Sequence, residues 1–198
     1  MTEQRGGSQN THLDWYERRS AQDPVMVLAF SGWNDAGNAA SSAAEYLEQT
    51  WGAAPFATID AEEFFDFTAI RPSIELTQTG ERRISWPSTT FTIAEGALEG
   101  RDLIIVRGTE PQLKWRTFTE TILTIAQEMG VTTMVSFGAL LADVPHTRPT
   151  VVYTSSSGGV PEFEELETST YEGPTGIIGV IHSACSVAGI PYASLWAT

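Results

Sequence analysis

The sequence predicts an α/β fold, a three-layer α/β/α sandwich with a mostly parallel central sheet and an inserted antiparallel β region. Continuous apolar runs at residues 25–30, 103–106 and 131–137 are typical of strands that are covered on both faces. The first two runs are followed by polar loops and then by segments whose apolar residues recur at helical spacing. Between residues 60 and 95 this rhythm gives way to short segments of alternating polar and apolar residues, which indicate antiparallel hairpins.

The turn at residues 31–37 joins the first predicted strand to the first predicted helix. Gly32 and Gly37 allow a sharp turn, and Asn34 or Asp35 is placed to cap the helix by accepting hydrogen bonds from its free N–H groups. Alanines on one face of this helix would let it lie close to a sheet. The turn carries neither the Gly-x-Gly-x-x-Gly pattern of dinucleotide sites nor the Gly-Lys-Ser/Thr ending of a phosphate loop.

The remaining elements follow in chain order. A strand at residues 56–59 completes a βαβ unit with the first strand and helix. Thr79 and Gly80 are placed at the turn of a hairpin, and Gly130 is placed to end the second long helix as a left-handed cap. We further expect strands at residues 74–77, 83–86, 89–93, 150–154 and 192–196 and a helix at residues 176–188.

Composition and charge narrow the range of partners. The 198 residues suffice for one sizeable core, and we expect a polar N-terminal extension at 1–23 before a single α/β domain at 24–198. The 25 acidic and 11 basic side chains give a net charge of −14, which would repel nucleic acid and anionic membranes. Cys185 is the only cysteine, so the chain forms no internal disulfide, which fits a reducing cytoplasm. No apolar run is long enough to span a bilayer.

Three polar loops follow the three apolar strands, and parallel strands would bring these loops to one edge of the sheet. Open α/β folds bind ligands at that edge. The edge is therefore the candidate ligand or partner site. Its predicted residues are Gly32, Trp33, Asn34, Asp35, Glu110, Trp115, Arg116, Asp143 and His146.

The chemistry of this edge leaves several alternatives. Oxygen and imidazole groups there could hold a hard metal ion, but no pair has a recognised ligand spacing, so a structural role is favoured and no metal or cofactor is expected. Asp143 and His146 could act as an acid–base pair, although no nucleophile elbow of the Gly-x-Ser-x-Gly type accompanies them. Trp115, between two basic residues, either forms a partner-binding patch or caps the core at a helix start.

The segment from residue 60 to 95 departs from the βα rhythm and is rich in aromatic residues. One interpretation is an edge extension of the sheet. The other is a surface that a second copy of the chain covers, since exposed aromatic hairpins need a covering surface. On the second interpretation, the candidate interface residues are Phe64, Phe65, Phe67 and Trp86, with Arg71, Arg82 and Arg83 at the rim.

Several motifs in order resemble the proteasome assembly chaperone 2 family, in an actinobacterial-type form. They are GWNDAG at 32–37, GTEP at 108–111, WRTF at 115–118, GALLADVPH at 138–146, YEGPTG at 171–176 and SLWA at 194–197. The resemblance covers residues 25–197 and implies an α/β/α sandwich similar to phosphorylase/hydrolase-like folds. It also implies self-association, often as small rings or trimers, and it brings no established catalytic residues. Because the family runs on past the SLWA segment, we expect this chain to be truncated at its C-terminus.

The function expected from these observations is a cytoplasmic, non-enzymatic protein-binding module that associates with itself. By analogy with eukaryotic and archaeal relatives, proteasome subunits are its expected partners. Nucleic acid and membranes are not expected to bind. The alternative is an enzyme of nucleoside phosphorylase or hydrolase type that uses the three loops as its pocket, which ordered acidic groups with shifted pKa values would favour.

Overall fold

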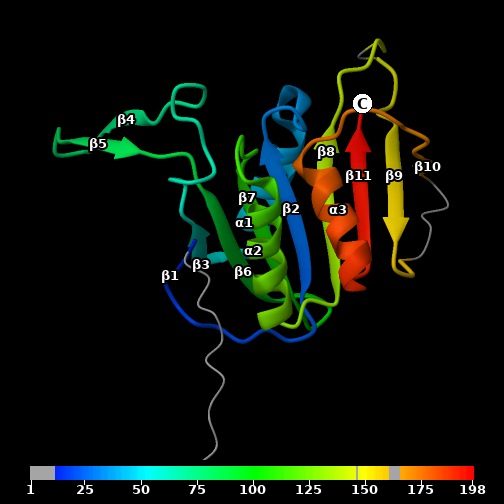
Figure 1. Cartoon of the computed structure of the whole chain (residues 1–198), viewed down its shortest axis with the longest axis horizontal. Helices are drawn as coiled ribbons and strands as arrows, with labels where there is room; N and C mark the ends of the chain where they lie inside the picture. Colours follow the sequence, from blue (N-terminus) through cyan, green and yellow to red (C-terminus); the bar gives the residue numbers. More distant parts are fainter. Residues whose placement is uncertain (1–11, 146, 161–165) are drawn as a thin grey trace, which may run out of the picture.

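The computed structural model describes residues 12–145, 147–160 and 166–198. In this part of the chain nine strands form one mixed sheet, and helices cover both of its faces (Figure 1). In spatial order the strands are β1 (Leu13–Trp15), β3 (Ala54–Ile59), β6 (Thr89–Leu98), β7 (Arg101–Thr109), β2 (Val25–Ser31), β8 (Thr133–Ala139), β11 (Tyr192–Ala197), β9 (Val152–Ser157) and β10 (Glu167–Thr168). The helices are the 3₁₀ turn η1 (Ala36–Asn38), α1 (Ala39–Trp51), α2 (Trp115–Glu128) and α3 (Ile177–Ala188).

The three predicted core strands are neighbours in the middle of the sheet, as expected. β2 pairs in parallel with β7 on one side and with β8 on the other, so that Leu28 lies opposite Val106 and Ser136. β11 extends this parallel group beyond β8. The outer strands β3, β6 and β9 run antiparallel to their inner neighbours. The sheet is therefore parallel at its centre and antiparallel further out, except that the edge strand β10 pairs in parallel with β9.

Each face of the sheet has its own core. On one face lies α1, where the fully buried Ala44 and the neighbouring Ala40 allow the helix to approach β2 and β7 closely. On the other face lie α2 and α3, whose buried side chains include Phe118 and Ile181 and pack against Leu28 of β2. These two helix layers and the sheet make the three-layer sandwich that the sequence predicts.

The inserted region divides into two parts. β4 (Ser73–Leu76) and β5 (Arg82–Ser85) form the expected antiparallel hairpin, which stands apart from the main sheet. We call this hairpin, with Trp86 at its base, the β4–β5 arm; Figure 1 shows it projecting from the left of the body. β6, by contrast, runs for ten residues and lies inside the main sheet between β3 and β7. Part of the predicted insertion is thus a structural strand of the sheet.

Phe64 and Phe65, predicted at an interface between copies, are buried in the core of their own chain. The ring of Phe64 lies edge-on to Phe118, with 5.3 Å between ring centroids. The reason is local: the backbone N–H groups of both residues bond to the carbonyl of Ala61, which turns the segment inward over the sheet. Only Phe67 and Trp86 remain at the base of the arm, stacked edge-to-face at 4.8 Å.

The sheet begins before residue 24. β1 pairs antiparallel with β3, so its strand lies within the segment that the sequence predicts as a polar extension at 1–23. Arg18 stacks over the ring of Trp15 at 3.8 Å and also forms an ion pair of 3.0 Å with Glu128 at the end of α2. Residues 1–11 of the predicted extension lie outside the described residues. Among the described helices, none is long and apolar enough to cross a membrane.

Candidate functional site

The loops that follow β2, β7 and β8 meet at one edge of the sheet, at the top in Figure 1. Asn34 is fully buried there, and its Nδ2 donates a hydrogen bond of 2.6 Å to Oε1 of Glu110. The carbonyl of Asn34 accepts a bond of 2.8 Å from the backbone N–H of Ala139 at the end of β8. The side chain and the backbone of Asn34 together therefore connect all three loops.

Glu110 also forms a hydrogen bond with the start of α3. Its Oε1 accepts a second hydrogen bond, 2.8 Å long, from the backbone N–H of Ile177, the first residue of α3. Gly176 at the N-cap offers no side chain for this purpose, so the carboxylate of Glu110 takes the place of a cap. A negative charge at this end of a helix is favourable because the helix dipole is positive there.

Gly176 must be a glycine for this arrangement to exist. A Cβ atom on Gly176 would overlap Oδ1 of Asn34 and would lie 2.6 Å from Oε1 of Glu110. Gly32 makes a related approach with φ +120°, and a Cβ there would lie 3.4 Å from Cβ of Glu110. Two of the motifs therefore contain glycines that allow close contact around one carboxylate.

Asp35 acts as the predicted helix cap. Its Oδ1 accepts hydrogen bonds of 2.8 Å from the N–H of Ala40 and 3.3 Å from the N–H of Ser41, in the first turn of α1. Oδ2 of Asp35 and Oδ1 of Asn34 are buried without a protein hydrogen-bond partner. Asp35 and Glu110 thus both accept hydrogen bonds from backbone N–H groups at the starts of helices.

The other predicted site residues do not join this cluster. Asp143 and Arg116 are exposed, on the loop after β8 and on α2, and His146 lies outside the described residues. Trp115 is half-buried against the core at the start of α2, and its indole N–H donates to the carbonyl of Pro111, which favours the core-capping interpretation. Across the described residues, no three histidine, cysteine or acidic side chains are grouped to hold a metal ion.

A groove that the sequence does not predict lies beside this edge, between α3 and strands β9 and β11. Its cavity volume is about 380 Å³. Tyr153 and Trp196 sit opposite each other on neighbouring strands and form its floor. We call it the aromatic groove, defined by Trp33, Leu140, Tyr153, Tyr171, Ile178 and Trp196. Among the candidate site residues that the structure describes, Trp33 alone lines it, and it is 60% exposed.

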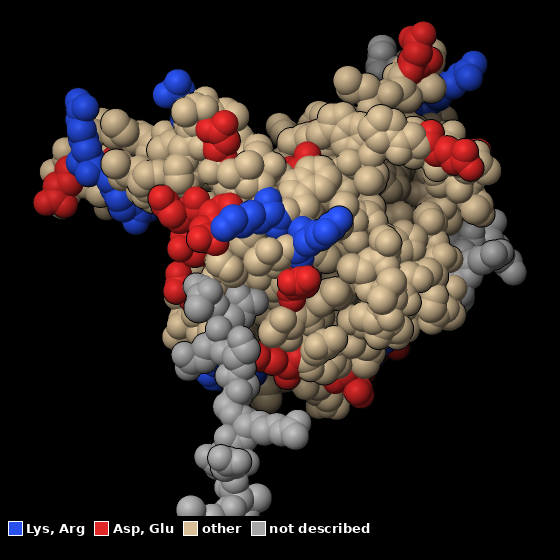
Figure 2. Space-filling view, viewed as in Figure 1, with Lys and Arg blue, Asp and Glu red and all other residues tan. Residues whose placement is uncertain are grey.

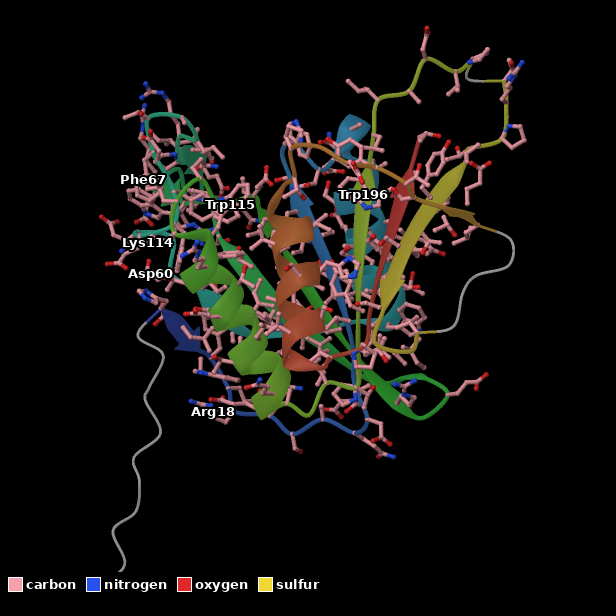
Figure 3. The ribbon with its side chains drawn as sticks, turned by 45° about the vertical axis from the view of Figure 1, so that its right-hand side comes forward. Arg18, Asp60, Phe67, Lys114, Trp115 and Trp196 are labelled. Carbon is pink, nitrogen blue, oxygen red and sulfur yellow. The ribbon has the colours of Figure 1, made fainter. Side chains whose placement is uncertain are left out.

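Trp196 is held in the groove by close contact with β8, and Figure 3 shows it on the α3 side of the sheet. A Cβ atom on Gly138 would overlap the ring of Trp196, which lies opposite it on β11. Gly138 and Trp196 each belong to a motif that was identified in the sequence. No pattern in the sequence linked the two motifs in space.

His182 of α3 forms one wall of the groove. Its ring stacks on that of Tyr192 at 4.5 Å, and its Nε2 shares a hydrogen bond of 3.0 Å with Oγ of Ser157. Burial lowers the pKa of His182 below its ordinary value, because the partly apolar surroundings disfavour the charged ring. Burial likewise raises the pKa of the Cys185 thiol on the same helix to about 12, so that it stays protonated at neutral pH.

The lowered pKa of His182 predicts a specific loss of stability in acid. The unfolded chain binds the proton more tightly than the folded chain, so this contribution to stability is present above the ordinary histidine pKa of about 6.5 and is lost as the pH falls through the folded value. Between pH 7.5 and 5, the melting temperature of the native protein should fall more steeply than that of His182→Gln. Ser157→Ala, which keeps the histidine, should retain the steeper fall; equal slopes for native protein and His182→Gln would contradict the prediction.

Comparison with known proteins places this geometry in a family. The model of the PAC2 family matches residues 29–198. A PAC2 family protein from Streptomyces avermitilis is 47% identical, with a TM-score of 0.81 over 89% of this chain and 75% of that one. A proteasome-assembly chaperone homologue from Mycobacterium tuberculosis is 42% identical, with a TM-score of 0.80 over 87% of this chain and 74% of that one.

More distant structures share the fold. PbaB of Pyrococcus furiosus, an archaeal proteasome activator, is 19% identical with a TM-score of 0.70, over 93% of this chain and 78% of that one. Among curated proteins, none matches the chain significantly. The family match over most of the chain and the two relatives above 40% identity confirm the resemblance found in the motifs. The chain belongs to the PAC2 family.

Proposed function

We propose that this protein is a chaperone-like, non-enzymatic module of the cytoplasm that binds proteasome subunits and associates with itself. The observation that carries the proposal is the 42% identity, over 87% of the chain, to the proteasome-assembly chaperone homologue of Mycobacterium tuberculosis. A relationship this close, over most of the fold, supports a shared class of function, although a fold alone would not.

The geometry of the loop edge supports a binding role over the enzyme alternative. A nucleoside phosphorylase or hydrolase needs an acid or base that can reach its substrate. Asp35 is buried, and both it and Glu110 bond to backbone N–H groups at helix starts. These acids hold the loops in place and are poorly placed to exchange protons with a substrate.

Exposed apolar groups are the second support. On the arm, Leu76 is 71% exposed, and on the loop after β8 Leu141 is 93% exposed. Large exposed apolar side chains gathered in patches mark surfaces that other proteins cover. The net charge of −14 would additionally favour partners with basic surfaces and would speed their encounter.

The proposal is tested by mixing the purified protein with separated proteasome α and β subunits from the same cells. We expect one of the subunits to comigrate with it in size-exclusion chromatography at about 10 μM, where a complex with a Kd of about 1 μM is mostly formed. Assembly of the subunits should also be faster in its presence. An unrelated folded protein of equal net charge is the control for nonspecific attraction. Absence of both comigration and faster assembly would refute the proposed partner.

A further inference from the structure

The β4–β5 arm has one apolar face. Ile74 lies opposite Ile84 in the antiparallel pair and Leu76 is two residues further along β4, so these side chains share a face, and Trp86 follows directly after the end of β5. These four side chains are between 51% and 71% exposed. A two-stranded hairpin of this kind is only marginally stable in water by itself. The apolar face of the arm therefore lacks a cover within the described part of its own chain.

The aromatic groove is the complementary feature at the other end of the molecule. Apolar rings line its walls and floor, and the exposed Leu140 and Leu141 continue the apolar surface along its upper rim. The volume of about 380 Å³ is at the low end of the range for ligand pockets, which suits one or two large side chains. The volume and the largely apolar lining of the groove thus suit the side chains of a hairpin.

A basic side chain on the arm and acidic side chains beside the groove are of opposite sign. On the apolar face of the arm Arg82 lies opposite Leu76, whereas Arg83 lies on the other face and forms an ion pair of 3.3 Å with Glu75. Beside the groove, the exposed Glu167 pairs in register with Tyr153 and the exposed Glu172 follows Tyr171, whereas the loop after Leu140 carries both Asp143 and Arg148. Figure 2 shows both basic and acidic side chains on the projecting arm at the left and near the upper right of the body. Such complementarity steers encounter and fixes orientation.

An arm cannot reach the groove of its own chain. The arm branches off between β3 and β6, whereas the groove lies over β11 and β9, and β9 is five strand positions from β6 in the sheet. At the usual spacing of neighbouring strands this separation is roughly 24 Å. Figure 3 agrees, with Phe67 at the base of the arm and Trp196 of the groove on opposite sides of the molecule. The arm and the groove of one described chain therefore lie too far apart to cover each other.

We propose that the apolar face of the β4–β5 arm of one copy docks into the aromatic groove of a second copy. The inference rests on the self-association in the proposed function and names the surfaces that perform it. Trp86, Ile84 and Ile74 supply the apolar contact, and Arg82, which lies on the same face opposite Leu76, faces the acidic side chains beside the groove. Each copy then offers one arm and one groove, so the contact is head-to-tail and closes into a ring or continues as a chain, depending on the rotation between copies.

The test uses two single variants of the full chain, measured by light scattering and sedimentation. Ile84→Glu damages the arm, and Trp33→Asp damages the groove; both sites are more than half exposed, and circular dichroism melting checks that each variant folds. Each variant alone should be monomeric where the native protein associates, with self-association weakened at least about tenfold. Mixed in equal amounts, they should form a dimer, because the intact arm of the groove variant fits the intact groove of the arm variant.

The other arrangements give different results, and each would overturn the proposal. Arm-to-arm pairing leaves the Trp33→Asp protein associated and gives no rescue on mixing. A groove filled by a small ligand or by another protein also leaves that variant associated, and a native protein that stays monomeric removes the interface altogether. Tyr46→Ser, at an exposed aromatic residue of α1 outside both surfaces, is the matched control and should associate normally.

A cysteine pair gives a measurement that does not depend on loss of function. Ile84→Cys in one population and Leu140→Cys in another should form a disulfide-linked dimer on mixing and oxidation, and neither population alone should do so. Cys185 is buried and does not interfere. Because binding to proteasome subunits is measured separately, a failure of the arm-in-groove contact is distinguishable from a failure of the proposed function.

Discussion

Replacing Phe64 by alanine should lower the free energy of unfolding by about 3–5 kcal/mol, because the change empties a fully buried site. The ring packs edge-on against Phe118, and the carbonyl of Phe64 accepts hydrogen bonds of 3.0 and 3.1 Å from the N–H groups of Gln112 and Leu113. The residue therefore joins the inserted region to the loop before α2. Urea denaturation followed by circular dichroism gives the change in the midpoint and in the free energy.

Trp86→Ala is the matched control, because Trp86 is also a large aromatic residue of the inserted region but is 51% exposed. We expect a stability loss well below that at Phe64, together with weaker self-association. If both substitutions destabilise the fold equally, Trp86 belongs to the core and not to a docking surface. If Phe64→Ala costs less than about 1 kcal/mol, the assigned burial of its ring is wrong.

The second large effect is expected at Glu110. Glu110→Ala leaves Nδ2 of Asn34 and the N–H of Ile177 without their acceptor. Each unpaired buried donor costs about 1–3 kcal/mol, so we expect a total loss of about 2–6 kcal/mol. The loss should be concentrated at the start of α3. Hydrogen exchange measured by mass spectrometry should show faster exchange in peptides that cover this helix start than in those that cover α1.

Glu110→Gln separates the hydrogen bonds from the charge. The amide keeps one oxygen that can accept from Asn34 and Ile177, and it loses only the attraction between a carboxylate and the helix dipole, which is about 0.3–1 kcal/mol. Glu120→Ala, at an exposed position in the middle of α2, should be nearly neutral. A Glu110→Ala protein as stable as the Glu120→Ala protein would show that the carboxylate does not hold the edge together.

Much of the fold could be predicted from the sequence because its central strands are continuous runs of apolar residues. β2 reads Val-Met-Val-Leu-Ala-Phe-Ser, and only a strand with a helix layer on each face buries both sets of alternate side chains. The cap by Asp35 and the left-handed end at Gly130 were also predictable, because they depend on neighbouring residues. These elements depend on interactions between residues that are close in the sequence, so they can be predicted from one sequence alone.

The remaining features depend on contacts between distant parts of the chain. The partner of Glu110 at the start of α3 is 67 positions away, and no local pattern marks an acid as the cap of a remote helix. The burial of Phe64 depends on a turn at Ala61, and the aromatic groove depends on the antiparallel pairing of β9 with β11. Composition indicated that the inserted region was rich in aromatic residues, but not which of those residues face inward.

The position of β2 at the centre of the sheet has a consequence for synthesis on the ribosome. β2 ends at residue 31, but its partners β7 and β8 end only at residues 109 and 139. At a translation rate of 5–20 residues per second, the ribosome needs roughly 5–20 s to pass from the end of β2 to the end of β8. Until β7 is complete, this apolar strand has both of its hydrogen-bonding edges unpaired, and the edge that pairs with β8 stays unpaired for the whole interval, which favours aggregation. Until residue 139 has left the exit tunnel, the nascent chain therefore exposes a strand edge with which other chains can pair.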